Sequence, residues 1–239
     1  SCIRCHNEGK EVEGGDLLWK GKRLFEDLGC YGCHDTLGFG EDKRRMIGPG
    51  LRNIKNKVGA RWITAWIKDP KGFRPTTLMP DFRLTEEEAQ AIAAYLWQHA
   101  DEKGIYEEMP AFDDEQLSQG DFLFEQMGCM ACHTYEKDAE RGFAPNLARI
   151  SEKINYGYLV EWIMNPQGKE PLTRMPSFRM SQERASLVAG YLIHKTGTGV
   201  PKEGLADVGW LEDKDKSHVG EALIKRYGCF GCHEIKGME

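Results

Sequence analysis

Apolar residues recur at helical spacing along most of the chain, in segments that polar loops separate. Three of these segments, "KGKRLFEDLG", "SQGDFLFEQMG" and "HVGEALIKRYG", share an internal glycine, the apolar spacing and a terminal glycine. Such spacing is typical of helices with one apolar face. Two further apolar segments, "AQAIAAYLW" and "ASLVAGYLI", follow Thr85 and Ser181, which are residue types that begin helices. The pattern predicts a mainly α protein.

Composition narrows the class of protein but not its function. The 239 residues are enough for one large domain or two of about 100 residues each. A content of 40% hydrophobic and 29% charged residues is typical of a globular protein. The net charge of −6, without a dense basic patch, argues against a nucleic-acid partner. We find no signal peptide and no membrane span of ~18 apolar residues, which leaves open an anchor outside these residues.

All eight cysteines lie in four C-x-x-C pairs, and a histidine follows each pair directly. The four motifs are Cys2, Cys5 and His6; Cys30, Cys33 and His34; Cys129, Cys132 and His133; and Cys229, Cys232 and His233. C-x-x-C-H is the attachment pattern of c-type haem. Two thiols one helical turn apart can reach the two vinyl groups of one porphyrin, and the histidine offers a ring nitrogen to the iron. The motifs predict four covalently attached haem c groups.

Other interpretations of the cysteine pairs are weaker. A zinc site could use Cys2, Cys5, Cys30 and Cys33, but the gap of 24 residues between the pairs exceeds the usual ribbon spacing. Redox-active dithiols and disulfides are also open, yet neither needs a histidine after every pair.

The last three motifs begin repeated units, because Cys30 to Cys129 is 99 residues and Cys129 to Cys229 is 100. Met79 follows the second motif and Met175 follows the third, each in a Met-Pro step within a polar loop. A single methionine would be interpreted as core filling. Two methionines in matched positions instead predict the sixth ligands of two haem irons.

These features resemble class I c-type cytochromes over residues 16–100 and again over residues 113–198. The resemblance rests on an N-terminal helix that ends in C-x-x-C-H, a Gly-Pro or Ala-Pro loop, and a Met-Pro loop before a C-terminal helix. It implies tandem class I cytochrome c domains, each a few helices wrapped around a covalently attached haem. Ala144 in the second unit replaces Gly48 of the first, which leaves the proline in place.

The resemblance also implies contacts within each unit. The first and last helices should cross where a glycine meets an aromatic residue: Gly21 and Phe25 with Tyr95, and Gly120 and Phe124 with Tyr191. The loop prolines, Pro49 and Pro145, should lie against the histidine ligands, with a neighbouring carbonyl that accepts the imidazole N–H. Three tryptophans could pack on haem, reach a propionate or belong to the helix core: Trp62, Trp66 and Trp162.

The two remaining haem motifs lack a complete unit. Residues 214–239 are interpreted as the start of a further cytochrome c domain, truncated, whose methionine is expected beyond Glu239 because Met238 is too close to His233. Residues 1–15 are interpreted as a partial haem-binding segment. Its distal ligand could come from a missing segment, another subunit or one of three histidines, for which surface or capping roles are preferred: His99, His194 and His218, the last at the expected start of a helix.

A haem held by histidine and methionine has no free coordination position, and methionine raises its reduction potential. We therefore expect an electron carrier rather than an enzyme, with four haems and a periplasmic or otherwise extracytoplasmic location. Its expected partners are a membrane quinol-oxidising complex and a terminal reductase or oxidase. A multihaem peroxidase, a nitrogen-oxide reductase subunit and a polymerising cytochrome filament are the alternatives. The donor, the acceptor, the haem potentials and the oligomeric state are not determined by the sequence.

Overall fold

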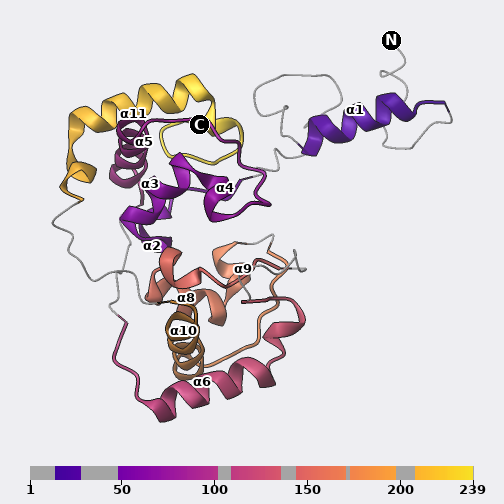
Figure 1. Cartoon of the computed structure of the whole chain (residues 1–239), viewed down its shortest axis with the longest axis vertical. Coiled ribbons are helices and arrows are strands. Elements are labelled where there is room, and N and C mark those ends of the chain that lie inside the picture. The colour runs from indigo at the N-terminus through magenta and orange to yellow at the C-terminus, as the bar shows by residue number, and fades with distance from the viewer. Residues whose placement is uncertain are drawn as a thin grey trace. The chain divides into compact units, whose positions relative to one another are not determined.

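The structure is a computed structural model of the chain, shown in Figure 1. It describes residues 14–27, 48–101, 109–135, 144–170, 173–197 and 208–238. Within these ranges the regular structure is helical, with no strand and one isolated antiparallel bridge between Val58 and Ile154. The prediction of a mainly α protein is confirmed. In the same ranges, no helix is both long enough and apolar enough to cross a membrane.

The described elements follow one another in chain order, with short 3-10 turns between some of the α-helices. They are α1 Asp16–Asp27, α2 Ile54–Lys57, α3 Ala60–Lys68, α4 Pro70–Phe73, α5 Glu86–Gln98, α6 Asp114–Gln126, η3 Cys129–Ala131, α7 Ile150–Lys153, α8 Tyr156–Met164, α9 Pro166–Lys169, α10 Gln182–Thr196, η5 Gly209–Glu212, α11 Lys214–Tyr227 and η6 Cys229–Gly231.

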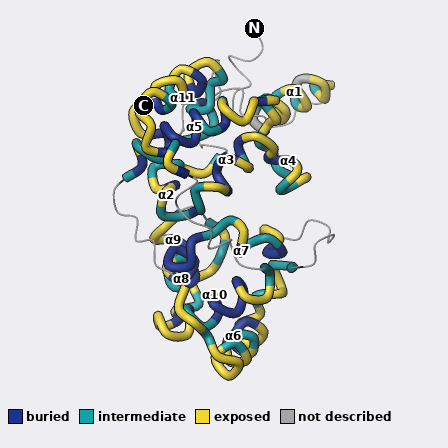
Figure 2. The backbone as a smooth tube through the Cα atoms, turned by 60° about the vertical axis from the view of Figure 1, so that its left-hand side comes forward, coloured by how far each residue is buried: buried dark blue, intermediate teal, exposed yellow. Residues whose placement is uncertain are grey.

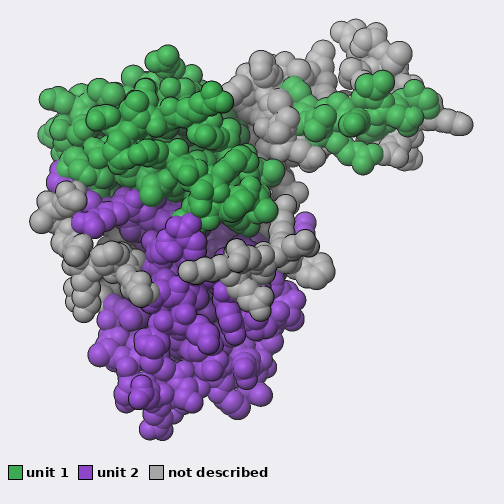
Figure 3. Space-filling model, viewed as in Figure 1, with its two compact units in different colours: residues 1–54, 64–100, 210–239 green, residues 55–63, 101–209 purple. Residues whose placement is uncertain are grey.

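The chain divides into two compact units, coloured separately in Figure 3. Unit 1 contains Ser1–Ile54, Thr64–Ala100 and Trp210–Glu239, and unit 2 contains Lys55–Ile63 and Asp101–Gly209. Unit 1 therefore combines the C-terminal segment with residues much earlier in the chain.

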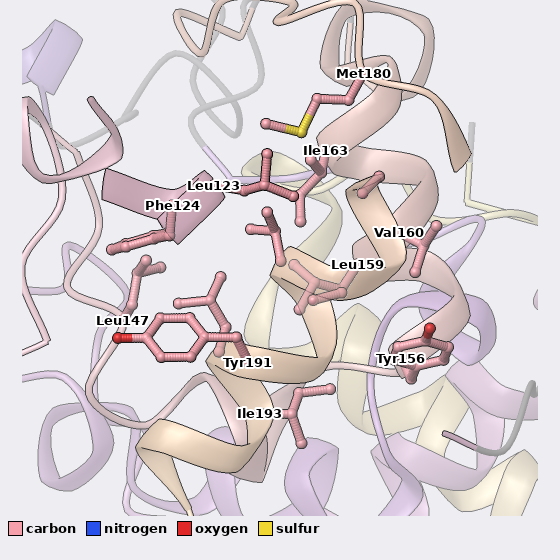
Figure 4. Close-up of a cluster of buried hydrophobic side chains, with 14 residues drawn as sticks. Leu123, Phe124, Leu147, Tyr156, Leu159, Val160, Ile163, Met180, Tyr191 and Ile193 are labelled. Atoms are coloured by element: carbon pink, nitrogen blue, oxygen red, sulfur yellow. The ribbon is translucent and has the colours of Figure 1, made fainter. Parts of the chain in front are cut away.

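In unit 2, α6 crosses α10 at Gly120. A Cβ at Gly120 would lie 2.7 Å from the Tyr191 Cβ and still closer to the Leu187 carbonyl oxygen, so a glycine is needed there. The Phe124 and Tyr191 rings lie 5.8 Å apart. The expected contact of Gly120 and Phe124 with Tyr191 is thus confirmed. Figure 4 shows these rings at one side of a buried apolar cluster that α8 completes with Leu159, among others.

In unit 1, the helix that packs against α5 is α11. The crossing again occurs at a glycine: a Cβ at Gly220 would lie 2.6 Å from the Ala91 carbonyl carbon and closer still to its oxygen. α5 is rich in buried alanine, and Figure 2 shows its buried positions as dark blue. The sequence predicted that Gly21 of α1 would occupy this place. Among the described residues, however, no atom lies within 4 Å of a Cβ built at Gly21.

The starts of the C-terminal helices agree with the sequence pattern. Thr85 caps α5 in a capping box with Glu88, and the Ser181 side chain accepts the Arg184 N–H at the start of α10. The predicted start of a helix at His218 is wrong, because α11 begins at Lys214 after the cap residue Asp213.

Candidate functional site

Each of the two described haem motifs leaves its helix through a left-handed glycine. Gly128 after α6 has φ 68° and Gly228 after α11 has φ 67°, a conformation that glycine adopts without steric cost. The following Cys-x-x-Cys forms a 3-10 turn, η3 or η6, in which the histidine N–H donates to the first cysteine's carbonyl at 3.0 Å. The haem motif after α6 and the haem motif after α11 therefore adopt the same backbone conformation.

A proline carbonyl fixes the ring of each histidine. His133 Nδ1 lies 2.8 Å from the Pro145 oxygen, and His233 Nδ1 lies 2.8 Å from the Pro49 oxygen. Because a carbonyl can only accept, Nδ1 carries the proton, and Nε2 presents the lone pair that a metal needs. Burial lowers the pKa of His233, which favours the neutral ring, while the Pro49 carbonyl acts in the opposite direction.

The loop that carries this proline pairs with the motif in the same way in both units. Two backbone hydrogen bonds join the loop to the residues that end the motif. They are Ala144 N to Cys132 O at 3.1 Å and Leu147 N to Thr134 O at 2.6 Å in unit 2, and Gly48 N to Cys232 O at 2.9 Å and Leu51 N to Glu234 O at 2.9 Å in unit 1. The expected proline–histidine contact is found for Pro145 and His133. For Pro49 the partner is His233, where the sequence predicted His34.

The two methionines also occupy equivalent surroundings. The Trp66 indole N–H donates to the Met79 sulfur at 2.9 Å, and the Trp162 indole N–H donates to the Met175 sulfur at 3.0 Å. Both methionines are half-buried. The sequence predicted haem packing, a propionate contact or a core role for these tryptophans, but not a contact with the methionine sulfur. The signal was present as an equal spacing of 13 residues in the two units.

A second feature that sequence reasoning missed is the backbone after each Met-Pro step. Arg83 has φ 53° and Arg179 has φ 52°, which is uncommon for residues other than glycine. Their N–H groups donate to Asp81 Oδ1 at 2.8 Å and to Ser177 Oγ at 3.4 Å. These contacts turn the loop towards the cap of the following helix in both units.

The four described cysteines are thiols, and burial affects two of them. Burial raises the pKa of Cys229 to about 11 and also raises the pKa of Cys129, so both sulfurs are uncharged at neutral pH. None of the four described cysteines is in a disulfide. Addition of a thiol across a vinyl group gives an uncharged thioether, which a partly buried position tolerates.

The described residues therefore fit a c-type haem at two places. Unit 2 contains Cys129, Cys132, His133 and Met175 within one uninterrupted stretch of sequence. In unit 1 the structure places Cys229, Cys232 and His233 in the same compact unit as Met79. A cytochrome c uses two cysteines to attach the porphyrin, and an imidazole nitrogen and a thioether sulfur to hold the iron.

The remaining predicted ligands are two N-terminal motifs and three further histidines. The motifs Cys2, Cys5, His6 and Cys30, Cys33, His34 lie outside the described residues, as does the zinc site weighed against them. The three other candidate histidines, His99, His194 and His218, are exposed. His99 stacks on Tyr95 with 4.0 Å between ring centroids, and its Nδ1 lies 2.9 Å from the Tyr95 carbonyl.

Comparison with known proteins supports this chemistry. Residues 19–100 match the cytochrome c family, so a cytochrome c domain is present in the chain. The chain is 32% identical over 89 residues to cytochrome c oxidase subunit 2 of Alkalihalophilus pseudofirmus, a match that covers 34% of the chain and 25% of that relative. It is 30% identical over 92 residues to a nitric oxide reductase subunit of Stutzerimonas stutzeri, and this match covers 36% of the chain and 60% of that relative. No solved structure matches. The match and the helical structure are consistent with a class I cytochrome c fold, and the family implies covalently bound haem c. The chain spans less than two thirds of the length of either relative.

Proposed function

We propose that the chain is a multihaem electron-transfer protein that relays electrons along four covalently attached haem c groups. The observation that carries this proposal is the pair of matched sites, in which a proline carbonyl fixes the histidine and an indole N–H contacts the methionine sulfur. We assign Cys2, Cys5, Cys30, Cys33, Cys129, Cys132, Cys229 and Cys232 to haem attachment, and His6, His34, His133, His233, Met79 and Met175 to iron ligation.

The residues around each site favour electron transfer over substrate chemistry. When bound, haem iron supplies a reversible one-electron couple. Ligation by both a histidine nitrogen and a methionine sulfur would leave no coordination position for a substrate. The Pro145 carbonyl holds the His133 ring, and α6, α8 and α10 contribute side chains to a buried apolar cluster in the same unit.

The partners and the location are part of the same proposal. Both similar proteins are named as subunits of an oxidase or a reductase. We extend this to the present chain as association with a membrane respiratory complex, in which it carries electrons from a quinol-oxidising complex to a terminal enzyme. The corresponding location is periplasmic or otherwise extracytoplasmic, since c-type haems are attached on that side of the membrane.

The experiment that tests the ligand assignment is Met175→Ala, in protein that was loaded with haem during export. Loss of the sulfur should lower the reduction potential of one haem, because methionine ligation raises it. It should also open that iron to carbon monoxide, which gives a new absorption spectrum. Met109→Ala is the control, because Met109 is exposed and also precedes a proline, but lies before α6 and outside the two matched loops. It should change neither property.

Two results would contradict the proposal. An unchanged potential in the Met175→Ala protein would remove this sulfur from the iron. Rapid turnover of peroxide, nitrite or nitric oxide by the unaltered protein would favour the enzymatic alternative, because turnover requires an open haem.

A further inference from the structure

We propose that residues 208–238 supply the N-terminal half of the haem domain whose C-terminal half is residues 48–100. The haem attached at Cys229 and Cys232 then takes Met79 as its sixth ligand, although Met79 lies 150 positions before Cys229 in the chain. The inference rests on the haem binding proposed above and concerns how one of the pockets is assembled.

The first support is the backbone pairing between the two segments. His233, Cys232 and Glu234 meet the loop at residues 48–51 through the same three contacts that His133, Cys132 and Thr134 make in unit 2. In unit 2 the motif and its methionine belong to one continuous stretch, so these contacts mark a complete pocket. Their repetition in unit 1 indicates that residues 229–234 occupy the motif position of the pocket that contains Met79.

The second support is the helix crossing. Gly220 meets the Ala91 carbonyl of α5, just as Gly120 meets the Leu187 carbonyl of α10. Ile224, one turn further along α11, is fully buried, as Phe124 is in α6. Close approach of two helix backbones at a glycine requires a defined register, so α11 lies on α5 as α6 lies on α10.

The third support is a set of side-chain contacts that anchor both ends of the segment. Gln98 Nε2 donates to the Leu211 carbonyl at 2.7 Å before α11 begins, and the Tyr95 hydroxyl donates to the Lys236 carbonyl at 3.3 Å after the motif. The Phe82 and Tyr227 rings lie 5.4 Å apart, which ties the segment to the Met-Pro loop. The position equivalent to Tyr227 in the first unit is Leu28, so this ring contact belongs to α11.

Two segments of the chain have the pattern needed to pack on α5. Residues 16–34 and 214–233 carry the same pattern of glycine, apolar positions and C-x-x-C-H. Both are therefore candidate partners for one surface, formed by α5 and the loop at residues 48–51. The family match at residues 19–100 contains residues 19–34 of the first segment, so a contiguous domain is the competing arrangement. The contacts of the structure assign the surface to α11 and the motif that follows it.

A pair of matched glycine substitutions tests the assignment in the haem-loaded chain of 239 residues. Gly220→Ala should raise the hydrogen-exchange rates of α5 amides by about tenfold or more, because its Cβ collides with backbone atoms of Ala91. Gly21→Ala should leave these rates unchanged. The opposite pattern would overturn the proposal: faster exchange of α5 amides in Gly21→Ala and an unchanged rate in Gly220→Ala. This readout does not depend on electron transfer, so its failure is distinct from failure of the proposed function.

A second test follows the ligand. Methionine-ligated ferric haem has a characteristic weak absorption band at long wavelength, to which the Met79 and Met175 haems should both contribute. Cys229→Ala with Cys232→Ala prevents attachment of one haem and should remove about half of this band. Cys30→Ala with Cys33→Ala should leave the band intact. A loss of the band in the Cys30→Ala, Cys33→Ala variant alone would assign Met79 to the haem of His34. It would refute the composite pocket, by which we mean the pocket that residues 48–100 and 208–238 form together.

Discussion

Gly120→Ala is the substitution whose effect the structure defines most sharply. Gly120 lies in the interior of α6, where it meets α10 in unit 2. A Cβ there would lie 2.7 Å from the Tyr191 Cβ and closer to the Leu187 carbonyl oxygen. Carbon atoms in contact prefer separations of about 3.5–4.0 Å, so the two helices must move apart by about 1 Å.

Two opposing contributions set the size of the effect. Alanine is more favourable than glycine in a helix interior by about 1 kcal/mol. Overpacking typically costs about 1–3 kcal/mol, and a gap of about 1 Å also forfeits much of the dispersion energy between Phe124 and its neighbours. The collision is with backbone, which cannot rotate away. We therefore expect a net destabilisation of about 2 kcal/mol, or a fall in the melting temperature of about 8–16 °C for a unit of this size.

Calorimetry of the haem-loaded protein measures this change, and hydrogen exchange of α10 amides assigns it to unit 2. Phe122→Ala is the control on the same helix, because Phe122 is exposed and its loss should change stability by less than about 0.5 kcal/mol. A Gly120→Ala protein with an unchanged or higher melting temperature would refute the close crossing of α6 and α10.

Two further predictions concern pH and helix capping. Burial, with Glu170 and Glu161 nearby, raises the pKa of Tyr158 to about 12. Because this exceeds the unfolded value of about 10, protonated Tyr158 contributes fully to the free energy of unfolding below about pH 10, and the contribution is lost as pH rises towards 12. Thermal melts of Tyr158→Phe should therefore show a smaller fall in stability over this pH range. Thr85→Ala removes the capping box with Glu88 and should cost about 1 kcal/mol in unit 1, which denaturant titration would measure; Thr85→Ser should restore most of it.

Much of unit 2 could be predicted from the sequence, because its parts are continuous in the chain. The repeat placed the motif, the proline loop and the Met-Pro loop in order, and the apolar spacing predicted the helices that carry them. Ser181 and Pro145 have the contacts that the sequence led us to expect. The contact of Trp162 with Met175 and the backbone of Arg179 were not foreseen, since they depend on how a loop folds and not on apolar periodicity.

The assembly of unit 1 could not be predicted, for a physical reason. Gly21 and Gly220 belong to segments with the same helical pattern, so hydrophobic burial alone favours both equally. Chain connectivity favours the nearer segment only weakly, because the entropy of loop closure grows with the logarithm of loop length. The choice therefore depends on individual side chains such as Tyr227 and Gln98, whose contacts are visible only in the structure.

The composite pocket would also determine which haems have the higher reduction potentials. If Met79 serves His233 and Met175 serves His133, the methionines of both matched loops are in use, and His34 needs a different sixth ligand. A haem without methionine has a lower potential than one with it, and axial ligands move haem potentials over a range of about 0.8 V. A redox titration should then resolve two haems at high potential, and the Cys30→Ala, Cys33→Ala variant should lose a haem of lower potential. Loss of a high-potential haem from that variant would instead favour the contiguous domain, with Met79 bound to the iron that His34 holds.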